Sequence, residues 1–204
     1  DFGALALAQA YAFFVTGIAN FGLPIVYERN FFASQDRGEG AALLYSTILF
    51  VFGAFVVTGA LTWLFADRFS LWIIGDARHA SLLGWSFLAA GIMSLKVYFL
   101  TYFKNSENAK SFAAYTIDEN LIAFVLSLVF VAGLKIGVVG IPYGQIIAGA
   151  IVFLRLSRRF LRELPPAFSR PLLTGSLKIS FPWSQRSARQ RAKYRLPART
   201  ASAR

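Results

Sequence analysis

Residues 41–66 read AALLYSTILFVFGAFVVTGALTWLFA, and this stretch contains no charged side chain. A helix needs about 20 predominantly apolar residues to cross the hydrocarbon core of a bilayer, so the stretch predicts a membrane-spanning helix. The sequence as a whole predicts an all-α membrane protein, a bundle of about five transmembrane helices within residues 1–171. The four further spans are predicted at about residues 4–27, 82–103, 113–134 and 138–154.

The composition supports a membrane protein and argues against a soluble enzyme. Of the 204 residues, 56% are hydrophobic and only 15% are charged, whereas a typical soluble domain is about a quarter charged. The chain has no Cys and one His, and no glycine loop ending in Lys-Ser/Thr cradles a phosphate. We therefore expect neither catalysis nor a bound metal ion or cofactor.

The basic residues of the connecting segments predict the orientation in the membrane. Cytoplasmic loops of membrane proteins carry an excess of Lys and Arg, which places the richer side in the cytoplasm. Between the second and third spans, the sequence FSLWIIG at residues 69–75 predicts a segment that lies along the membrane surface. The richer side holds Arg29, Arg37, Lys104, Lys110, Arg155, Arg158, Arg159, Arg162, Arg170 and Lys178, and the other side holds Arg68, Arg78 and Lys135.

Both ends of the chain carry unusual features. The orientation places Asp1 outside and no signal peptide pattern precedes the first span, so we expect at least one N-terminal helix to be missing. Residues 172–182 predict the start of a further helix. Residues 183–204 then hold seven Lys/Arg and no acid, so the net charge of +11 falls to 14 − 10 = +4 over residues 1–182. This tail is interpreted either as a shifted reading frame or as a disordered basic tail.

Three segments carry a family resemblance. FGALALAQAYAFFVTGIANFGLPIVYER, at residues 2–29, resembles the second helix of Wzx-type polysaccharide flippases. GVVGIPYGQIIAGAIVFL, at residues 137–154, resembles the turn from their fifth to their sixth helix, and LKISFP, at residues 177–182, resembles the entry to their seventh. The resemblance covers about residues 1–182. The family positions in the first segment are Phe2, Gly3, Gly17, Gly22, Leu23 and Arg29.

The resemblance implies a function. Wzx-type flippases belong to the multidrug/oligosaccharidyl-lipid/polysaccharide exporter superfamily, with a dozen or more helices in two lobes around a central cavity. The chain resembles helices two to six of the first lobe. The implied partners are an undecaprenyl-pyrophosphate-linked sugar and membrane lipids, without nucleic acid, and the implied place is the bacterial inner membrane. Two alternatives are a cation-coupled drug or metabolite exporter of the same superfamily, and a membrane binding or assembly protein whose basic tail contacts anionic lipid or nucleic acid.

Polar residues inside the predicted spans are candidate cavity residues, because the bilayer makes them costly. Gln9, Thr16 and Asn20 fall on one helix face, either as a stripe that binds sugar hydroxyls or as interhelical hydrogen-bonding groups. Arg29 follows the first span and either meets a lipid pyrophosphate or anchors the helix. Four glycines are expected to permit close helix packing, namely Gly17, Gly22, Gly53 and Gly59.

The third and fourth predicted spans hold the charged candidates. Lys96 is expected to point into the bundle, where it attracts a pyrophosphate. The alternatives are that its side chain snorkels toward the cytoplasmic end or pairs with an acid on another helix. Asp118 and Glu119 are interpreted as coupling carboxylates or as partners for Lys96, or alternatively as a solvated helix start. Tyr115 shares a helix face with Ser111 and Asp118 and is a further cavity candidate.

Overall fold

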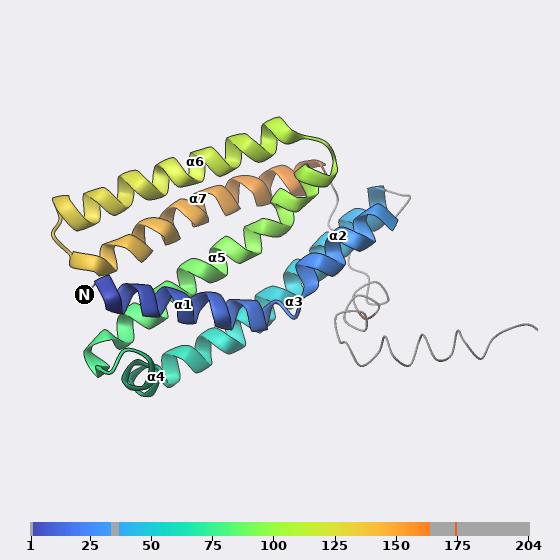
Figure 1. Ribbon diagram of the computed structural model, residues 1–204. Helices are drawn as coiled ribbons and strands as arrows, with labels where there is room; N and C mark the ends of the chain where they lie inside the picture. Colours follow the sequence, from blue (N-terminus) through green and yellow to red (C-terminus); the bar gives the residue numbers. More distant parts are fainter. Residues whose placement is uncertain (1, 34–36, 164–173, 175–204) are drawn as a thin grey trace, which may run out of the picture.

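The computed structural model describes residues 2–33, 37–163 and 174, and most of these residues are helical, with no strand among them (Figure 1). Short 3-10 or π turns join some of the helices, at η1 (Ala77–His79), η2 (Val129–Gly133) and η3 (Gly137–Val139). The helices are α1 (Phe2–Ala19), α2 (Leu23–Ala33), α3 (Arg37–Leu64), α4 (Ala66–Ile73), α5 (Ala80–Asn105), α6 (Ala109–Leu128) and α7 (Gly140–Glu163).

Within the described residues, five helical segments are long and apolar enough to cross a membrane. This finding confirms the predicted class, an all-α multi-pass membrane protein. The predicted start of a further helix at residues 172–182, apart from residue 174, and the predicted tail at residues 183–204 lie outside the described part of the chain. The five segments are Phe2–Ala19, Gly40–Leu64, Ala77–Asn105, Ala109–Gly133 and Gly137–Glu163.

The first predicted span is not a single helix. The chain breaks after α1, where Phe21 and Gly22 take left-handed backbone angles of φ 50° and 70°, and α2 continues from Leu23. A left-handed pair ends a helix, and Pro24 then fits the first turn of α2 because a first-turn residue needs no N–H for the helix ladder. The prediction of one helix over residues 4–27 is therefore wrong. The two residues that signal the break, Gly22 and Pro24, can be read in the local sequence.

The last predicted span is longer than expected. α7 continues past Leu154 to Glu163, so the first part of the basic stretch is helical. Leu156 and Phe160 are fully buried, and the Phe160 ring lies 4.8 Å from that of Phe99, centroid to centroid. Packing on α5 thus extends the helix through residues whose positive charge had predicted a connecting segment.

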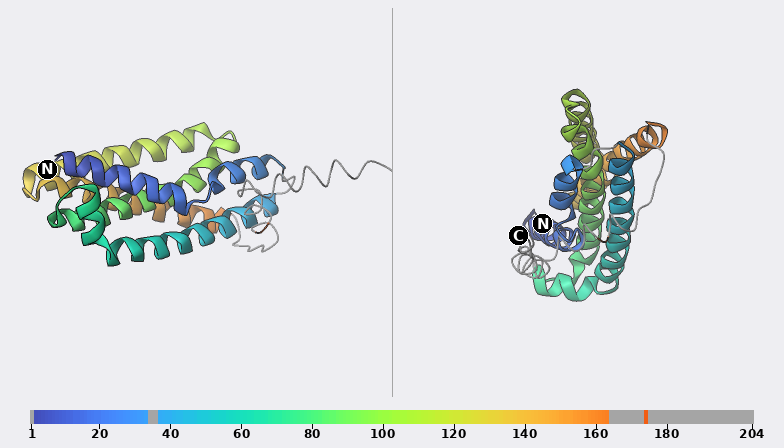
Figure 2. Two further views of the ribbon diagram at one scale, coloured as in Figure 1. Left: turned by 60° about the horizontal axis from the view of Figure 1, so that its bottom comes forward. Right: turned by 90° about the vertical axis from the view of Figure 1, so that its right-hand side faces the viewer.

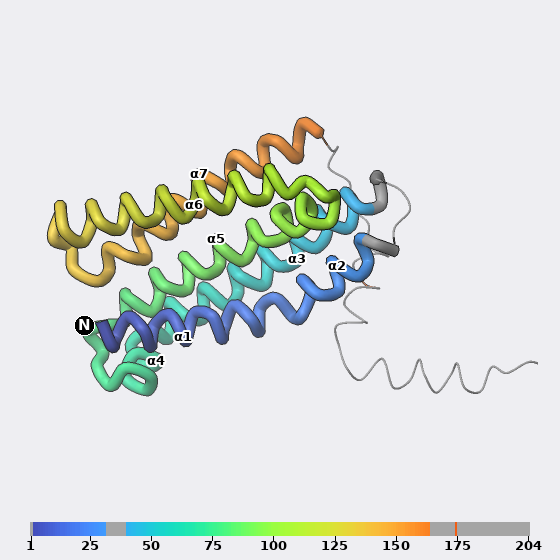
Figure 3. Tube along the Cα trace, turned by 45° about the horizontal axis from the view of Figure 1, so that its top comes forward, coloured from blue at the N-terminus to red at the C-terminus, as the bar shows by residue number. Residues whose placement is uncertain are grey.

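Helix α5 is the centre of the bundle. It lies between α1 and α3 on one side and the α6–α7 hairpin on the other, as Figures 2 and 3 show. In the most apolar stretch of the segment that contains α5, 67% of the residues are buried, against 6% in the corresponding stretch of the segment that contains α6. Helix α6 is therefore a peripheral element, held mainly by α7.

Helix α4 runs across one end of the bundle instead of along it (Figure 1). Its face toward the bundle buries Ala66 and Ser70, whereas Leu71 and Trp72 are 51% and 81% exposed. This orientation agrees with the predicted surface segment, because a short helix with an exposed apolar face suits the membrane interface.

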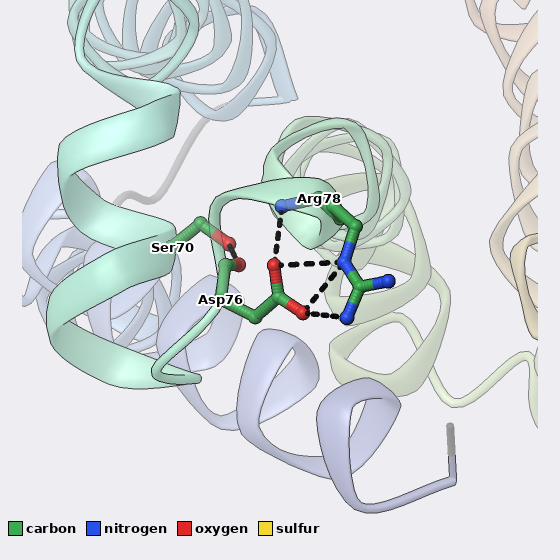
Figure 4. A network of polar contacts seen from close by, with 3 residues as sticks. All are labelled: Ser70, Asp76 and Arg78. Carbon is green, nitrogen blue, oxygen red and sulfur yellow. Dashed lines mark hydrogen bonds and ion pairs between the residues drawn. The ribbon is translucent and has the colours of Figure 1, made fainter.

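A small polar network shapes the connection from α4 to α5 (Figure 4). The Ser70 hydroxyl donates to the Asp76 carbonyl at 2.5 Å. The Asp76 carboxylate accepts from the backbone N–H and from the side chain of Arg78, each at 2.9 Å. These hydrogen bonds lower the pKa of Asp76 to about 2.

The predicted basic side of the protein corresponds to one end of the bundle. The junctions α2–α3 and α5–α6 and the end of α7 all lie at that end (Figure 1). The opposite end carries α4, η1 and the α6–α7 turn. Arg170 and Lys178 lie outside the described residues. The cytoplasmic placement of the basic end stays a prediction.

Candidate functional site

A buried ion pair joins the central helix α5 to the α6–α7 hairpin. The Lys96 ammonium on α5 pairs with the Glu119 carboxylate on α6, and their side chains are 10% and 2% exposed. Lys96 lies nine residues before the end of α5 and Glu119 lies ten residues after the start of α6. At 1.5 Å per residue both sit about 14–15 Å from the basic end, near the middle of a hydrocarbon core about 30 Å thick.

The pair confirms part of the sequence-based expectation and corrects another part. Lys96 points into the bundle, as predicted, and its partner is an acid on another helix. Glu119 does not belong to a solvated helix start, because it is almost completely buried. Whether either residue contacts a substrate stays a prediction.

Helix α7 closes over the pair through a glycine. A Cβ at Gly149 would meet the Ile92 side chain of α5 at 2.8 Å and the Glu119 Oε1 at 3.9 Å. Gly149 thus allows α7 to lie close to both helices and shields the carboxylate. Among the described residues Glu119 Oε1 has no hydrogen-bond partner. One carboxylate oxygen therefore faces Lys96, while the other is buried with an unused hydrogen-bonding capacity.

One residue of the predicted stripe, Asn20, forms interhelical hydrogen bonds, and it directly follows α1. The Asn20 amide donates to the Ser94 hydroxyl of α5 at 2.7 Å, and Asn20 Oδ1 accepts from the Tyr98 hydroxyl at 3.0 Å. Thr16 is buried and donates to the Ala12 carbonyl at 2.8 Å. Gln9 is partly buried. The contacts of Asn20 fit the interhelical interpretation, since small polar groups commonly link helices within membranes, whereas the Thr16 hydrogen bond stays within α1.

Asn20 and Glu119 contact α5 at different positions around the helix. Ser94 and Tyr98 lie on one face of α5 because four residues separate them, whereas Lys96 is about 200° from Ser94 around the helix. Asn20 contacts the first of these faces, and Glu119 contacts the other. Asn20 and the ion pair therefore lie on different faces of α5, and a role of these polar groups in lining a transport cavity stays a prediction.

Tyr115 and Asp118 take different positions on α6, since Tyr115 packs against the core and Asp118 faces outward. Asp118 is exposed and its carboxylate lies 3.5 Å from the Arg155 guanidinium of α7. Tyr115 is partly buried and stacks on Phe103, with ring centroids 5.8 Å apart and an interplanar angle of 11°. With Ser111 they line a groove of about 840 Å³ at the basic end of the α6–α7 hairpin. The predicted shared face is confirmed.

Arg29 is exposed on α2 and lines neither the ion pair nor this groove. Its neighbour Glu28 makes the contact to α5 instead, by an ion pair with Lys104 at 2.7 Å. The position of Arg29 fits an interfacial anchor. A role toward pyrophosphate stays a prediction.

Three of the four predicted glycines make no close helix approach. A Cβ at Gly17, Gly22 or Gly53 would meet nothing within 4 Å, and only Gly59 contacts a neighbouring helix closely, at 3.1 Å from the Phe87 ring. The tight positions missed by sequence reasoning are Gly84, Gly144 and Gly149. A glycine pattern in sequence does not reveal which face meets another helix, and this limits such predictions.

Sequence reasoning also missed the arginine face of the groove. Arg155, Arg158, Arg159 and Arg162 were counted only as topogenic charges, although their spacing of i, i+3, i+4 and i+7 places them on one helix face. That periodicity would have revealed the cluster if the basic stretch had been predicted as helical.

Comparisons of the chain with protein-family models, with curated proteins and with solved structures find no match. The fold and the site define a multi-pass α-helical membrane protein with a charged pair buried at mid-membrane.

Proposed function

We propose that the chain belongs to a flippase that exports a lipid-linked oligosaccharide for surface polysaccharide biosynthesis, in the inner membrane of a bacterium. The observation that carries the proposal is the buried pair of Lys96 and Glu119. Ionisable residues inside membrane helices are rare and mark transport pathways, because each charge costs about 2.5–3.5 kcal/mol at mid-helix on insertion scales. The resemblance of residues 1–182 to Wzx-type flippases supports the choice of substrate.

The mechanism follows from an exchange of partners. Glu119 neutralises Lys96 while the hairpin of α6 and α7 packs against α5. When the hairpin moves, Lys96 loses its carboxylate and a substrate phosphate replaces it as the counter-ion. This replacement is needed because a buried lysine without an anion is strongly unfavourable. No bond is made or broken, so this function is transport without catalysis.

A second candidate is a cation-coupled exporter of a drug or metabolite. One observation favours it, the buried Glu119 Oε1 that lacks a hydrogen-bond partner among the described residues. A carboxylate oxygen in this position accepts a proton or contacts a small cation. In this function Glu119 binds the coupling ion, and the positive charge of Lys96 affects how strongly the carboxylate holds that ion.

Transport by the full chain in lipid vesicles tests the proposal. The probe is a fluorescent polyprenyl-pyrophosphate oligosaccharide, and its crossing is followed by protection from a membrane-impermeant quencher. We expect Lys96→Ala to reduce the rate at least tenfold and Lys96→Arg to retain part of it. Lys104→Ala removes an exposed lysine of the same helix and serves as the matched control, with no more than a twofold effect.

Two results would count against the flippase. If the wild-type chain is folded and inserted but neither binds the probe nor moves it, the function is wrong. If Lys96→Ala transports as fast as wild type, the pair is structural. A rate that depends on a proton or sodium gradient, with a soluble cationic dye as the transported probe and loss in Glu119→Gln, would instead support the second candidate.

A further inference from the structure

The arginines of α7 form a continuous cationic face at the basic end of the protein. Leu156 and Phe160, on the other face of the same turns, are buried in the core. The arginines are thereby held on the outer side of the helix, toward α6. The groove there is lined by Ser111, Ala114, Tyr115, Asp118, Arg155, Arg158, Arg159, Arg162 and Glu163.

The groove has more positive than negative charge. Its four arginines face two carboxylates, a balance of 4 − 2 = +2. Asp118 contacts Arg155 at 3.5 Å and Glu163 contacts Arg159 at 2.7 Å. Arg158 and Arg162 make no ion pair with any residue that the structure describes. Two guanidinium groups are therefore available to an external anion, and guanidinium is well suited to phosphate because it donates two parallel hydrogen bonds.

The walls of the groove are held in place. The Arg159 guanidinium donates to the Ser111 hydroxyl at 3.2 Å and lies 4.8 Å from the centroid of the Phe103 ring. The Ser111 N–H in turn donates to the Asn108 side chain that caps α6. An anion entering the groove thus meets a charged surface whose central arginine is already oriented, which lowers the entropic cost of binding.

The depth of the groove matches that of lipid phosphates. Arg159 lies 19 residues after Gly140, the first residue of α7, which corresponds to about 28 Å of helix. The hydrocarbon core is about 30 Å thick. At the other end of the bundle Trp85 packs on Tyr143 and Trp63, at centroid distances of 5.0 and 5.3 Å. Aromatic residues favour the membrane interface, so the arginines occupy the opposite interface.

An apolar stripe on α6 continues from the groove toward the membrane centre. Leu121, Val125 and Leu128 follow Ala114 and Asp118 with helical spacing, so they extend the same face. They are 60%, 48% and 56% exposed. A ligand that suits both parts has an anionic head and an acyl chain.

We propose that this groove binds an anionic phospholipid, with its phosphate between Arg158 and Arg162 and one acyl chain along the stripe of α6. The site is separate from the Lys96–Glu119 pair and does not depend on the proposed transport. Bound lipid bridges α6 and α7 at their basic ends. It therefore stabilises a hairpin in which α6 is the less buried helix, since only 6% of its membrane-spanning residues are buried, against 33% for α7.

Lipid binding to the full chain in a neutral detergent tests this site by native mass spectrometry. The probes are phosphatidylglycerol, phosphatidylcholine with the same acyl chains, and inorganic phosphate. We expect phosphatidylglycerol to bind at least tenfold more tightly than phosphatidylcholine. Arg158→Gln combined with Arg162→Gln should remove most of this preference. Arg29→Gln combined with Lys104→Gln removes two cations from the same end outside the groove, and should keep it.

Each other outcome contradicts the proposal in a definite way. Equal binding of the two lipids excludes a headgroup site, and an equal loss in the control variant shows nonspecific charge attraction. Displacement of phosphatidylglycerol by inorganic phosphate at an equal concentration identifies a soluble-phosphate site. If the double variant does not fold, the wild-type chain is measured at rising salt: the preference should fall steeply, and a preference that salt leaves unchanged overturns the site.

Discussion

Asp118 and Glu119 are neighbours in the chain but lie in opposite environments. The Glu119 side chain is 2% exposed and pairs with Lys96, whereas the Asp118 side chain is 51% exposed and lies 3.5 Å from Arg155. Adjacent residues of a helix point about 100° apart, and here that rotation separates the bundle core from the surface groove. Both are ion pairs between a carboxylate and a basic side chain. The buried pair should matter much more for stability than the exposed pair, which water screens.

The largest expected effect is the loss of one buried partner. Lys96→Ala leaves the Glu119 carboxylate buried without a counter-ion, which costs about 3–5 kcal/mol. We expect a matching fall in the free energy of unfolding, measured by denaturant titration in detergent micelles. Lys104→Ala, which breaks the exposed pair with Glu28, should cost less than about 1 kcal/mol. Equal losses in the two variants would show that burial does not distinguish the pairs.

Removal of both buried charges should restore most of the stability. Lys96→Met combined with Glu119→Leu replaces the pair by apolar side chains of similar size, and such exchanges are often neutral or stabilising. We expect the double variant to unfold within about 1 kcal/mol of wild type while transport of the lipid-linked probe is lost. A double variant as unstable as Lys96→Ala alone would mean that Lys96 contributes through packing instead of through charge.

The surface pair should contribute little. Asp118→Asn removes the carboxylate that faces Arg155, and exposed ion pairs are typically worth about 0–1 kcal/mol. The free energy of unfolding should therefore change by less than about 1 kcal/mol. The same substitution raises the net positive charge of the groove, so phosphatidylglycerol should bind more tightly, as measured by native mass spectrometry. Weaker lipid binding would argue that Asp118 orients Arg155 for the headgroup.

The smallest effect concerns a third carboxylate, Asp76, at the other end of the bundle. Its folded-state pKa of about 2 lies below the value of an unfolded aspartate, near 3.9. Its contribution is therefore present above pH 4 and is lost as the pH falls through 2. We expect Asp76→Asn to unfold slightly earlier than wild type at pH 6 and to match it by pH 2, in thermal melts at a series of pH values. A difference that grows toward low pH would contradict this assignment.

The structure differs from the sequence-based prediction at two helix boundaries, and only one of these differences has a local signal in the sequence. The break between α1 and α2 has local signals, Gly22 and Pro24, that an apolar average over residues 4–27 conceals. The extension of α7 to Glu163 has no such signal in its hydropathy, because the arginines hide the buried positions Leu156 and Phe160. The charge of a side chain describes its own cost in the membrane and not the face on which its helix packs.

The sequence by itself determined the class of protein and the approximate position of the segments that, within the described residues, are able to span a membrane. The physical reason is that the hydrocarbon thickness demands runs of about 20 apolar residues, and such runs are legible without any tertiary contact. It also determined that Lys96 points inward, since lipid is a poor environment for an ammonium group. Only the tertiary structure decided that Glu119 is its partner, that Asp118 faces arginines, and that Asn20 contacts the opposite face of α5. Those outcomes depend on how helices rotate and pack against each other, and a rotation of one residue exchanges a buried group for an exposed one.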